Sequence, residues 1–340
     1  MQRNFVLTDV MKTGDHNEKA KFISMHSLSN QNFTTCGEYY ALHDFDLDSF
    51  DRKFAIVEMG GHIKKLENNN EFSNELKKRC RLLHSQGFIF IKSNPWESKE
   101  NLKKHLCSPT IDYKHLNWTG DASWFWFYMY NKHKGKKYNF EHSIKEYDFL
   151  YLNKLPRLHR KQLYKKMQPL ITNSLYTSWW EGIKLPKQYE LPNVKNYPEY
   201  GMDQEIFELP YSHTKYSLVS ETNDNSNDVF MTEKIWKPII AQHPFIVHGN
   251  YLYLQKLRSM GFKTFSSYFD ESYDLEIDSE KRIDKIFYSC QKILQINWRD
   301  LYLQTQALRK HNHNTFFDKE KLSLEINKTL ELFLEFADSR

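Results

Sequence analysis

Short apolar runs alternate with polar segments through the first half of the chain. Five of these runs are rich in β-favouring residues and predict strands: 5–7, 54–57, 88–91, 115–118 and 124–130. Between the second and third runs, Leu76, Cys80 and Leu83 recur at helical spacing and predict a helix over 74–84. Strands that alternate with helices are typical of a parallel sheet, so we expect an α/β fold.

A second α/β pattern starts near residue 147. Its apolar runs predict strands over 148–152, 173–180, 216–219 and 244–247. Helices are predicted from the end of the first strand to about 170, from about 232, and over 251–260, 280–296, 298–308 and 318–336. Gly261 is a usual stop signal for the third of these helices. Residues 186–210 contain four prolines and little periodicity, which indicates a loop.

The length of the chain indicates more than one domain. A chain of 340 residues exceeds the size that one hydrophobic core comfortably serves, so we expect two domains. The basic stretch 131–138 contains a glycine and is a candidate boundary. We therefore predict a first domain over 1–140, a second over 141–315 and a final helical segment over 316–340.

Composition and charge limit the classes of protein to which this chain can belong. Hydrophobic residues make up 40% of the chain, and the net charge of +5 permits a polyanionic partner without requiring one. Because the sequence has neither an 18-residue apolar stretch nor a basic-then-apolar start, we expect no membrane insertion and no export. The four cysteines lack metal-type spacing, which favours reduced thiols and a cytoplasmic protein.

Two residue patterns in the sequence resemble metal-binding motifs. Asp46-Leu47-Asp48 has an Asp-X-Asp form that can hold a metal, but short acidic patterns are common and no further ligands accompany it. His311 and His313 lie close together in what reads as a polar turn, without the spacing of a zinc site. We expect neither a metal nor another cofactor.

Residues 216–249 carry the densest set of candidate chemistry. The polar candidates in this segment are Ser220, Glu221, Thr232, Glu233 and Lys234. They lie where a predicted strand ends and where a predicted helix begins, and open α/β sheets bind ligands at such places. Exposed N–H groups there favour an anion, and Lys234 adds a positive charge. Glu233 suits the acceptance of hydrogen bonds from sugar hydroxyls, so a nucleotide sugar with its ribose and diphosphate fits this pattern. The alternatives are that Lys234 is an exposed lysine paired with Glu233 or Asp228, and that Ser220 and Glu221 cap the adjacent loop.

A second group of candidates follows the first strand of the second half. Asn153, Arg157 and Arg160 lie just beyond residues 148–152, at the expected carboxyl end of that strand. Arg157 could hold a diphosphate through two parallel hydrogen bonds. The alternative is that both arginines are solvated residues at a helix start, where the helix dipole disfavours them.

The 216–249 segment resembles the donor-site motif of the family-ten fucosyltransferases and their bacterial and viral relatives. The matching residues are Lys215-Tyr216, Glu221, the run from Phe230 through Met231-Thr232-Glu233-Lys234-Ile235 to Trp236, and 245–249. Thr222 and Asn250-Tyr251 depart from the usual motif, so fucose is not assumed as the sugar. The resemblance implies a GT-B fold, in which two Rossmann-like domains face each other across a cleft and the last helix returns toward the first domain. It also implies an inverting, metal-independent transfer from a nucleotide sugar.

An inverting transfer needs a carboxylate that deprotonates the acceptor hydroxyl. The family resemblance assigns that carboxylate to the first domain, where three candidates follow predicted strands. In order of preference they are Glu97, Asp121 and Glu58. Each of them could instead cap a helix.

The sequence leaves more than one kind of molecule as the acceptor of the sugar. The aromatic run 124–130 is followed by four lysines within 132–137, a combination that can stack on bases and neutralise phosphates. The alternative is a buried strand that leaves into a solvated loop. The Asn-, Lys- and Tyr-rich composition also resembles phage glycosyltransferases that decorate hydroxymethylated bases. We therefore consider a glycan or hydroxymethylated cytosine in duplex DNA as the acceptor, with a non-catalytic carbohydrate- or nucleic-acid-binding protein as the alternative.

Overall fold

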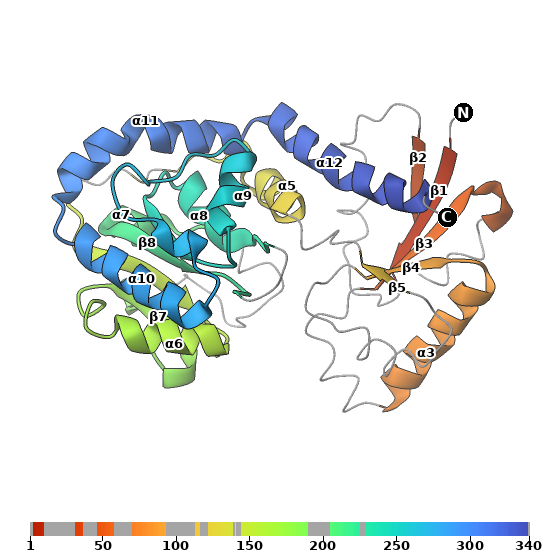
Figure 1. Ribbon diagram of the computed structural model, residues 1–340, viewed down its shortest axis with the longest axis horizontal. Coiled ribbons are helices and arrows are strands. Elements are labelled where there is room, and N and C mark those ends of the chain that lie inside the picture. Colours follow the sequence, from red (N-terminus) through yellow and green to blue (C-terminus); the bar gives the residue numbers. More distant parts are fainter. Residues whose placement is uncertain are drawn as a thin grey trace. The chain divides into compact units, whose positions relative to one another are not determined.

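A computed structural model describes residues 3–9, 31–36, 46–57, 70–92, 113–115, 122–138, 140, 144–189, 205–224 and 229–338 (Figure 1). Its contacts divide the chain into two compact units. The first unit comprises 1–124 and 323–340, and the second comprises 125–322. The division at 124 lies earlier than the boundary at 140 that we expected from the basic stretch.

The first unit contains a five-stranded parallel sheet in the order β2-β1-β3-β4-β5. Its strands are β1 (Arg3–Asp9), β2 (Gln31–Cys36), β3 (Arg52–Val57), β4 (Ile89–Lys92) and β5 (Tyr113–His115). The helix α3 (Asn70–Ser85) connects β3 to β4, and Cys80 and Leu83 on it are fully buried. A short 3-10 helix, η2 (Leu47–Ser49), precedes β3. The strand β2 was not predicted, because its run of Gln, Asn and Thr carries little apolar signal.

The second unit contains a four-stranded parallel sheet in the order β7-β6-β8-β9. Its strands are β6 (Tyr147–Asn153), β7 (Leu175–Ser178), β8 (Thr214–Ser220) and β9 (Phe245–His248). The helices are α6 (Leu158–Met167), α7 (Glu208–His213), α8 (Glu233–Ile240), α9 (Tyr253–Ser259), α10 (Ser279–Ile293) and α11 (Trp298–Phe316). Shorter 3-10 helices are η4 (Trp179–Glu181), η5 (Lys187–Tyr189) and η7 (Ser272–Leu275). The α/β class and the four strands predicted in this half are confirmed.

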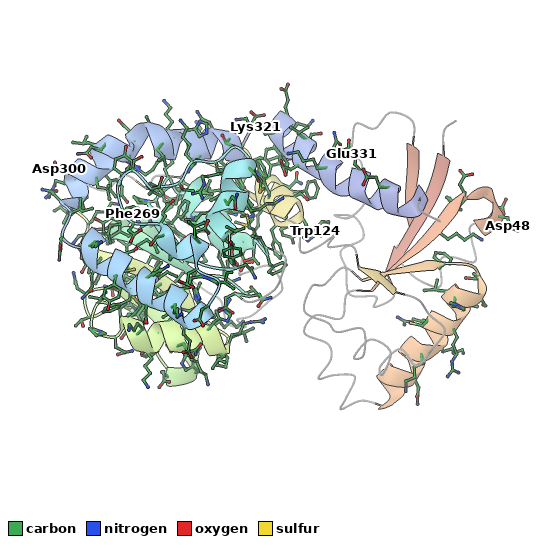
Figure 2. The ribbon with its side chains drawn as sticks, viewed as in Figure 1. Asp48, Trp124, Phe269, Asp300, Lys321 and Glu331 are labelled. Carbon is green, nitrogen blue, oxygen red and sulfur yellow. The ribbon has the colours of Figure 1, made fainter. Side chains whose placement is uncertain are left out.

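Helices cover both faces of the second sheet. The helix α10 lies beside α6, whereas α11 and α8 lie together on the opposite face (Figure 1). The strands between these layers are largely buried, as is usual when a parallel sheet is covered on both sides. Side chains fill this unit densely (Figure 2). Phe265 stacks on Phe269 at 5.3 Å and meets Phe245 edge to face at 5.1 Å.

The aromatic run 124–130 is not a strand, as predicted, but part of the helix α5 (Ala122–His133). Trp126, Phe127 and Met129 on this helix are fully buried. A helix that is apolar on several sides has no amphipathic stripe, so its periodicity resembles that of a buried strand. Trp126 packs on other aromatic rings of the second unit, which explains why the division of the chain falls in the first turn of this helix rather than after it.

The end of the chain is helical over a longer range than predicted. The helix α11 continues to Phe316, so His311 and His313 lie in a helix rather than in a polar turn. The helix α12 (Lys319–Asp338) follows. Gly261 has φ +90° just after α9, the left-handed conformation that glycine adopts readily, and this agrees with its predicted role as a helix stop. None of the helices in the described ranges is both long and apolar enough to span a bilayer.

Candidate functional site

The candidate site lies at the carboxyl ends of β6 and β8, the two central strands of the second sheet. From β6 the chain crosses to β7 on one side, and from β8 it crosses to β9 on the other side. Because parallel crossovers are right-handed, α6 and α8 are placed on opposite faces, and the loops diverge between the two strands. Open α/β sheets bind ligands at such a switch point. The sequence candidates in both groups surround it.

The last residue of each of the four strands carries a buried polar side chain. These residues are Asn153, Ser178, Ser220 and His248, which are at most 2% exposed. In the strand pairing, Asn153 is opposite Ser178 and Ser220 is opposite His248, so neighbouring side chains point to the same face. Their amide, hydroxyl and ring atoms make no hydrogen bond to any other described residue. Buried groups of this kind ordinarily bind water or a ligand.

Glu221, the residue after β8, is used entirely inside the protein. Its carboxylate accepts hydrogen bonds from the Tyr253 hydroxyl at 2.7 Å and from the Thr232 hydroxyl at 2.6 Å. The backbone N–H groups of Thr222 and Thr232 donate to the same carboxylate at 3.3 and 3.2 Å. Glu221 has no exposed surface. The structure therefore gives this side chain the role of fixing the loop between β8 and α8 rather than that of facing a ligand.

Arg160 and His159, in the first turn of α6, contact the backbone at the end of β8. The Arg160 guanidinium donates to the backbone carbonyl of Glu221 at 2.9 and 3.1 Å and to that of Ser220 at 3.4 Å. His159 Nε2 lies 3.0 Å from the same Glu221 carbonyl. These hydrogen bonds use the Arg160 guanidinium inside the protein, which gives this residue a positioning role.

Asp224 joins the ends of β8 and β9 to α6 and α10. Its carboxylate lies 3.4 Å from His159 Nδ1 and 3.7 Å from His248 Nε2, and it accepts a hydrogen bond from the Ser279 hydroxyl. Arg282 donates to the carbonyls of Asp224 and Gly249, each at 2.7 Å. Burial lowers the pKa of both histidines, and for His248 the neighbouring cationic groups lower it further.

The start of α8 presents the acidic and basic pair of the predicted motif. Thr232 is the N-cap, and its hydroxyl accepts from the Lys234 backbone N–H at 3.4 Å. The Lys234 ammonium donates to the hydroxyls of Thr222 and Thr232 at 3.2 and 3.1 Å and to Glu233 at 2.5 Å. The Lys234 side chain remains 26% exposed. Burial raises the pKa of Glu233, but Lys234 and Lys237 outweigh that effect, so the net pKa lies below its usual value.

Arg157 occupies the N-cap position of α6, with an extended backbone at φ −73° and ψ 148°. It is half-buried, and burial lowers the pKa of its guanidinium. An arginine stays protonated at neutral pH even so, because its ordinary pKa is far above 7. The start of α6 therefore carries a cation on the same sheet edge as Lys234.

The three predicted catalytic carboxylates, Glu58, Glu97 and Asp121, fall outside the described residues. Asp46 accepts from the backbone N–H of Asp48 at 3.2 Å and so caps η2. Within the described part of the chain, no group of three or more His, Cys, Asp or Glu side chains is arranged to hold a metal.

The two histidines of the predicted polar turn have backbone partners. His311 Nε2 lies 2.9 Å from the Gly261 carbonyl, and His313 Nδ1 lies 3.0 Å from the Ile240 carbonyl. These contacts tie α11 to the rest of the second unit.

Part of the aromatic and lysine run that suggested nucleic-acid binding makes contacts inside the second unit. Trp126 packs on Trp236, Phe262 and Phe316 and donates from its indole N–H to the Phe316 carbonyl at 2.8 Å. Lys132 forms an ion pair with Glu205 at 2.9 Å. Buried rings such as those of Trp126 and Phe127 cannot stack on bases, whereas Lys134, Lys136 and Lys137 are exposed.

Four residues of the site were missed by sequence reasoning: Asp224, His248, Tyr253 and Arg282. Asp224 lies in a loop rich in Asn, Asp and Ser, where acidic residues are unremarkable. Arg282 belongs to a helix 58 residues further along the chain, and no local pattern connects it to that loop. No family model, curated protein or solved structure matches this chain. The geometry of the site therefore carries the functional argument.

Proposed function

We propose that the protein is a glycosyltransferase whose second unit binds the diphosphate of a nucleotide sugar at the switch point between β6 and β8. The observation that carries this proposal is the grouping of Asn153 and Ser220 at the ends of the central strands with Glu233 and Lys234 at the start of α8. It combines unused hydrogen-bonding groups with a cation and a carboxylate. Such a set suits a ligand that has both phosphates and sugar hydroxyls.

In this proposal Arg157 and Lys234 neutralise the diphosphate. Both lie at the start of a helix, where backbone N–H groups also favour anions. As the bond to the sugar breaks, negative charge develops on the leaving nucleotide, and fixed cations stabilise it. Thr232 and Thr222 hold the Lys234 ammonium in place through their hydroxyls.

The sugar and ribose hydroxyls are assigned to Glu233, Asn153 and Ser220. Glu233 is anionic at neutral pH, because its pKa lies below the usual value, and it can accept two or more hydrogen bonds. Asn153 can donate and accept, and so can the Ser220 hydroxyl. Arg160 and Glu221 are assigned to positioning, since their hydrogen bonds fix the end of β8.

The remaining parts of the proposal rest on the family resemblance. A GT-B arrangement of the two units would bring an acceptor to the donor, and a carboxylate of the first unit would take the proton from the acceptor hydroxyl. The candidates are Glu97, Asp121 and Glu58. Attack by that oxygen on the anomeric carbon, with departure of the nucleotide diphosphate from the opposite side, would invert the configuration.

A thermal-shift screen tests the donor site. The protein is heated with UDP-, GDP-, ADP- and CMP-sugars, and a ligand bound by the folded state raises the melting temperature. We expect one nucleotide class to stabilise the protein and the matching sugar to be consumed when acceptors are added. Stabilisation without any turnover would favour a non-catalytic binding protein. If no nucleotide sugar stabilises the protein or is consumed, the proposal fails.

A further inference from the structure

Residues 152–187 carry a large share of the positive charge of this chain. Residues 152–187 contain eight Lys or Arg side chains and one acidic side chain, Glu181. The net charge of the segment is therefore +7, whereas that of the whole chain is +5, so the rest of the chain is net negative by two charges. Of the eight cations, Arg160 is buried and the other seven are half-buried or exposed. An uneven distribution of net charge of this kind is expected of a protein with a surface that binds a polyanion.

The segment forms one side of the second unit. It consists of the end of β6, the helix α6, the edge strand β7 and the 3-10 helices η4 and η5 (Figure 1). On its far side α6 packs against α10, whose acidic residues limit the surface: Asp284 pairs with Lys166 at 2.7 Å, and Glu280 accepts from Gln162 at 3.1 Å. We call the remaining surface of residues 152–187 the basic edge.

Three cations of the basic edge repeat along α6. Lys161 and Lys165 are four residues apart and so lie on one face of the helix, and Arg157 lies at its N-cap, where its carbonyl accepts from the Lys161 backbone N–H at 3.0 Å. Like charges at this spacing repel each other and destabilise a helix by about 0.2–0.5 kcal/mol per pair. A line of such charges, about 5–6 Å apart at the Cβ atoms, gains a compensating interaction when it meets a row of phosphates.

An aromatic ring lies at the end of the basic edge that reaches the candidate site. Trp179 follows Ser178, the last residue of β7, and is 37% exposed. The ammonium groups of Lys154 and Lys184 lie 5.4 and 6.0 Å from the centroid of its ring. An exposed indole among lysines is the combination with which proteins bind unpaired bases and the adjoining phosphates.

We propose that the basic edge binds a nucleic acid, with Trp179 stacking on a base and the lysines contacting the phosphates. A neutral glycan would gain little from the four exposed lysines of the basic edge, which are Lys161, Lys165, Lys184 and Lys187. Leu155 and Leu158 are also exposed, but the cations run the length of α6 rather than gathering around these two side chains, which favours a linear polyanion over a lipid surface. That the bound polymer is also the acceptor of the sugar rests on the proposed function.

The test measures binding of a fluorescent duplex and of its single strand, both about 20 nucleotides long, at about 50 to 200 mM salt. The triple variant Lys161→Ala, Lys184→Ala and Lys187→Ala removes three exposed cations of the basic edge and none of the proposed donor residues. The matched control, Lys263→Ala, Lys292→Ala and Lys310→Ala, removes three exposed cations elsewhere in the second unit. Both variants lose the same net charge.

We expect the triple variant to bind at least about tenfold more weakly at low salt, with a salt slope reduced by about one for each lysine lost. The control should stay within about threefold of the parent protein, and Trp179→Ala should weaken the single strand more than the duplex. Equal loss in both triple variants, no binding of either strand form, or stronger binding to vesicles of anionic phospholipid would overturn the inference. Donor-induced thermal shifts are measured on the same variants. A retained shift without nucleic-acid binding refutes the basic edge alone, and retained nucleic-acid binding without any shift refutes the donor site alone.

Discussion

Arg160 in α6 is joined to Glu221 after β8 by two hydrogen bonds from its guanidinium to the Glu221 backbone carbonyl, at 2.9 and 3.1 Å. The carboxylate of the same Glu221 accepts from Tyr253 and Thr232 on the other side. One residue thus receives hydrogen bonds from α6, from α9 and from the N-cap of α8. This arrangement fixes the strand end around which the candidate ligand groups are placed.

Replacing Arg160 should destabilise the second unit. Arg160→Ala removes charge-assisted hydrogen bonds to the Glu221 carbonyl, which keeps His159 Nε2 as a partner, so we expect the free energy of unfolding to fall by about 1.5–3 kcal/mol. Urea denaturation followed by circular dichroism measures the change. The neighbouring exposed Lys161 provides the control, since Lys161→Ala should change the free energy by less than about 0.5 kcal/mol. Similar values for the two variants would show that the Arg160 contacts contribute little.

Gly249 should tolerate no side chain while Tyr253 is in place. A Cβ atom on Gly249 would lie 2.4 Å from Tyr253 Cδ2, so the ring would have to move away from its hydrogen bond with Glu221. We expect Gly249→Ala to cost about 1–3 kcal/mol of unfolding free energy. In a Tyr253→Ala background the same change should cost less than about 0.5 kcal/mol, because the obstructing ring is gone. Additive effects in this double-mutant cycle would contradict the steric explanation.

Lys234 should matter for the donor and little for the fold. If its ammonium contacts the diphosphate, Lys234→Ala loses an interaction of about 1.5–3 kcal/mol and weakens donor binding by roughly ten- to a hundredfold. Titration calorimetry with the nucleotide sugar identified by the thermal-shift screen measures this change. Lys263→Ala, which removes an exposed lysine of the same unit, should leave the affinity unchanged. Unchanged donor affinity in Lys234→Ala would remove this residue from the site.

Stability should fall in mild acid because His243 is buried in its neutral form. Its ring nitrogens lie 2.8 Å from the Ser217 hydroxyl and 2.8 Å from the Thr214 carbonyl. Burial first, and then Lys145 and Arg309, lower its pKa well below the usual 6.5. The unfolded chain therefore takes up a proton that the folded protein does not, and the stability present above pH 6.5 declines as the pH falls below that value.

This single histidine should contribute a slope of up to about 1.4 kcal/mol per pH unit below its unfolded pKa. Unfolding free energies at several pH values, for the parent protein and for His243→Gln, measure the contribution. The variant should be less stable at neutral pH and should show a shallower acid decline. An exposed histidine serves as the control, and His84→Gln should leave the slope unchanged. The same slope in all three proteins would show that His243 does not produce it.

Local patterns predicted much of the second unit because its strands are continuous apolar runs and its helices have clear boundaries. The run 216–219 became part of β8, and the helix predicted from about residue 232 is α8, which has Thr232 as its N-cap. The helix α5 was mistaken for a strand because an all-round apolar helix lacks the period that distinguishes the two. The strand β2 was missed because its residues are mostly polar.

The sequence by itself determined the alternation of strands and helices, the position of Glu233 and Lys234 at a helix start, and the excess of positive charge in residues 152–187. Only the tertiary structure decided how the candidate polar residues are used. The side chains of Arg160 and Glu221 form hydrogen bonds inside the protein. The side chains of Asn153 and Ser220 form none with other described residues. The physical reason is that propensity and periodicity act over a few neighbouring residues, while hydrogen-bond partners such as Arg282 and Asp224 are separated by 58 positions and meet only when the sheet and its helices have packed.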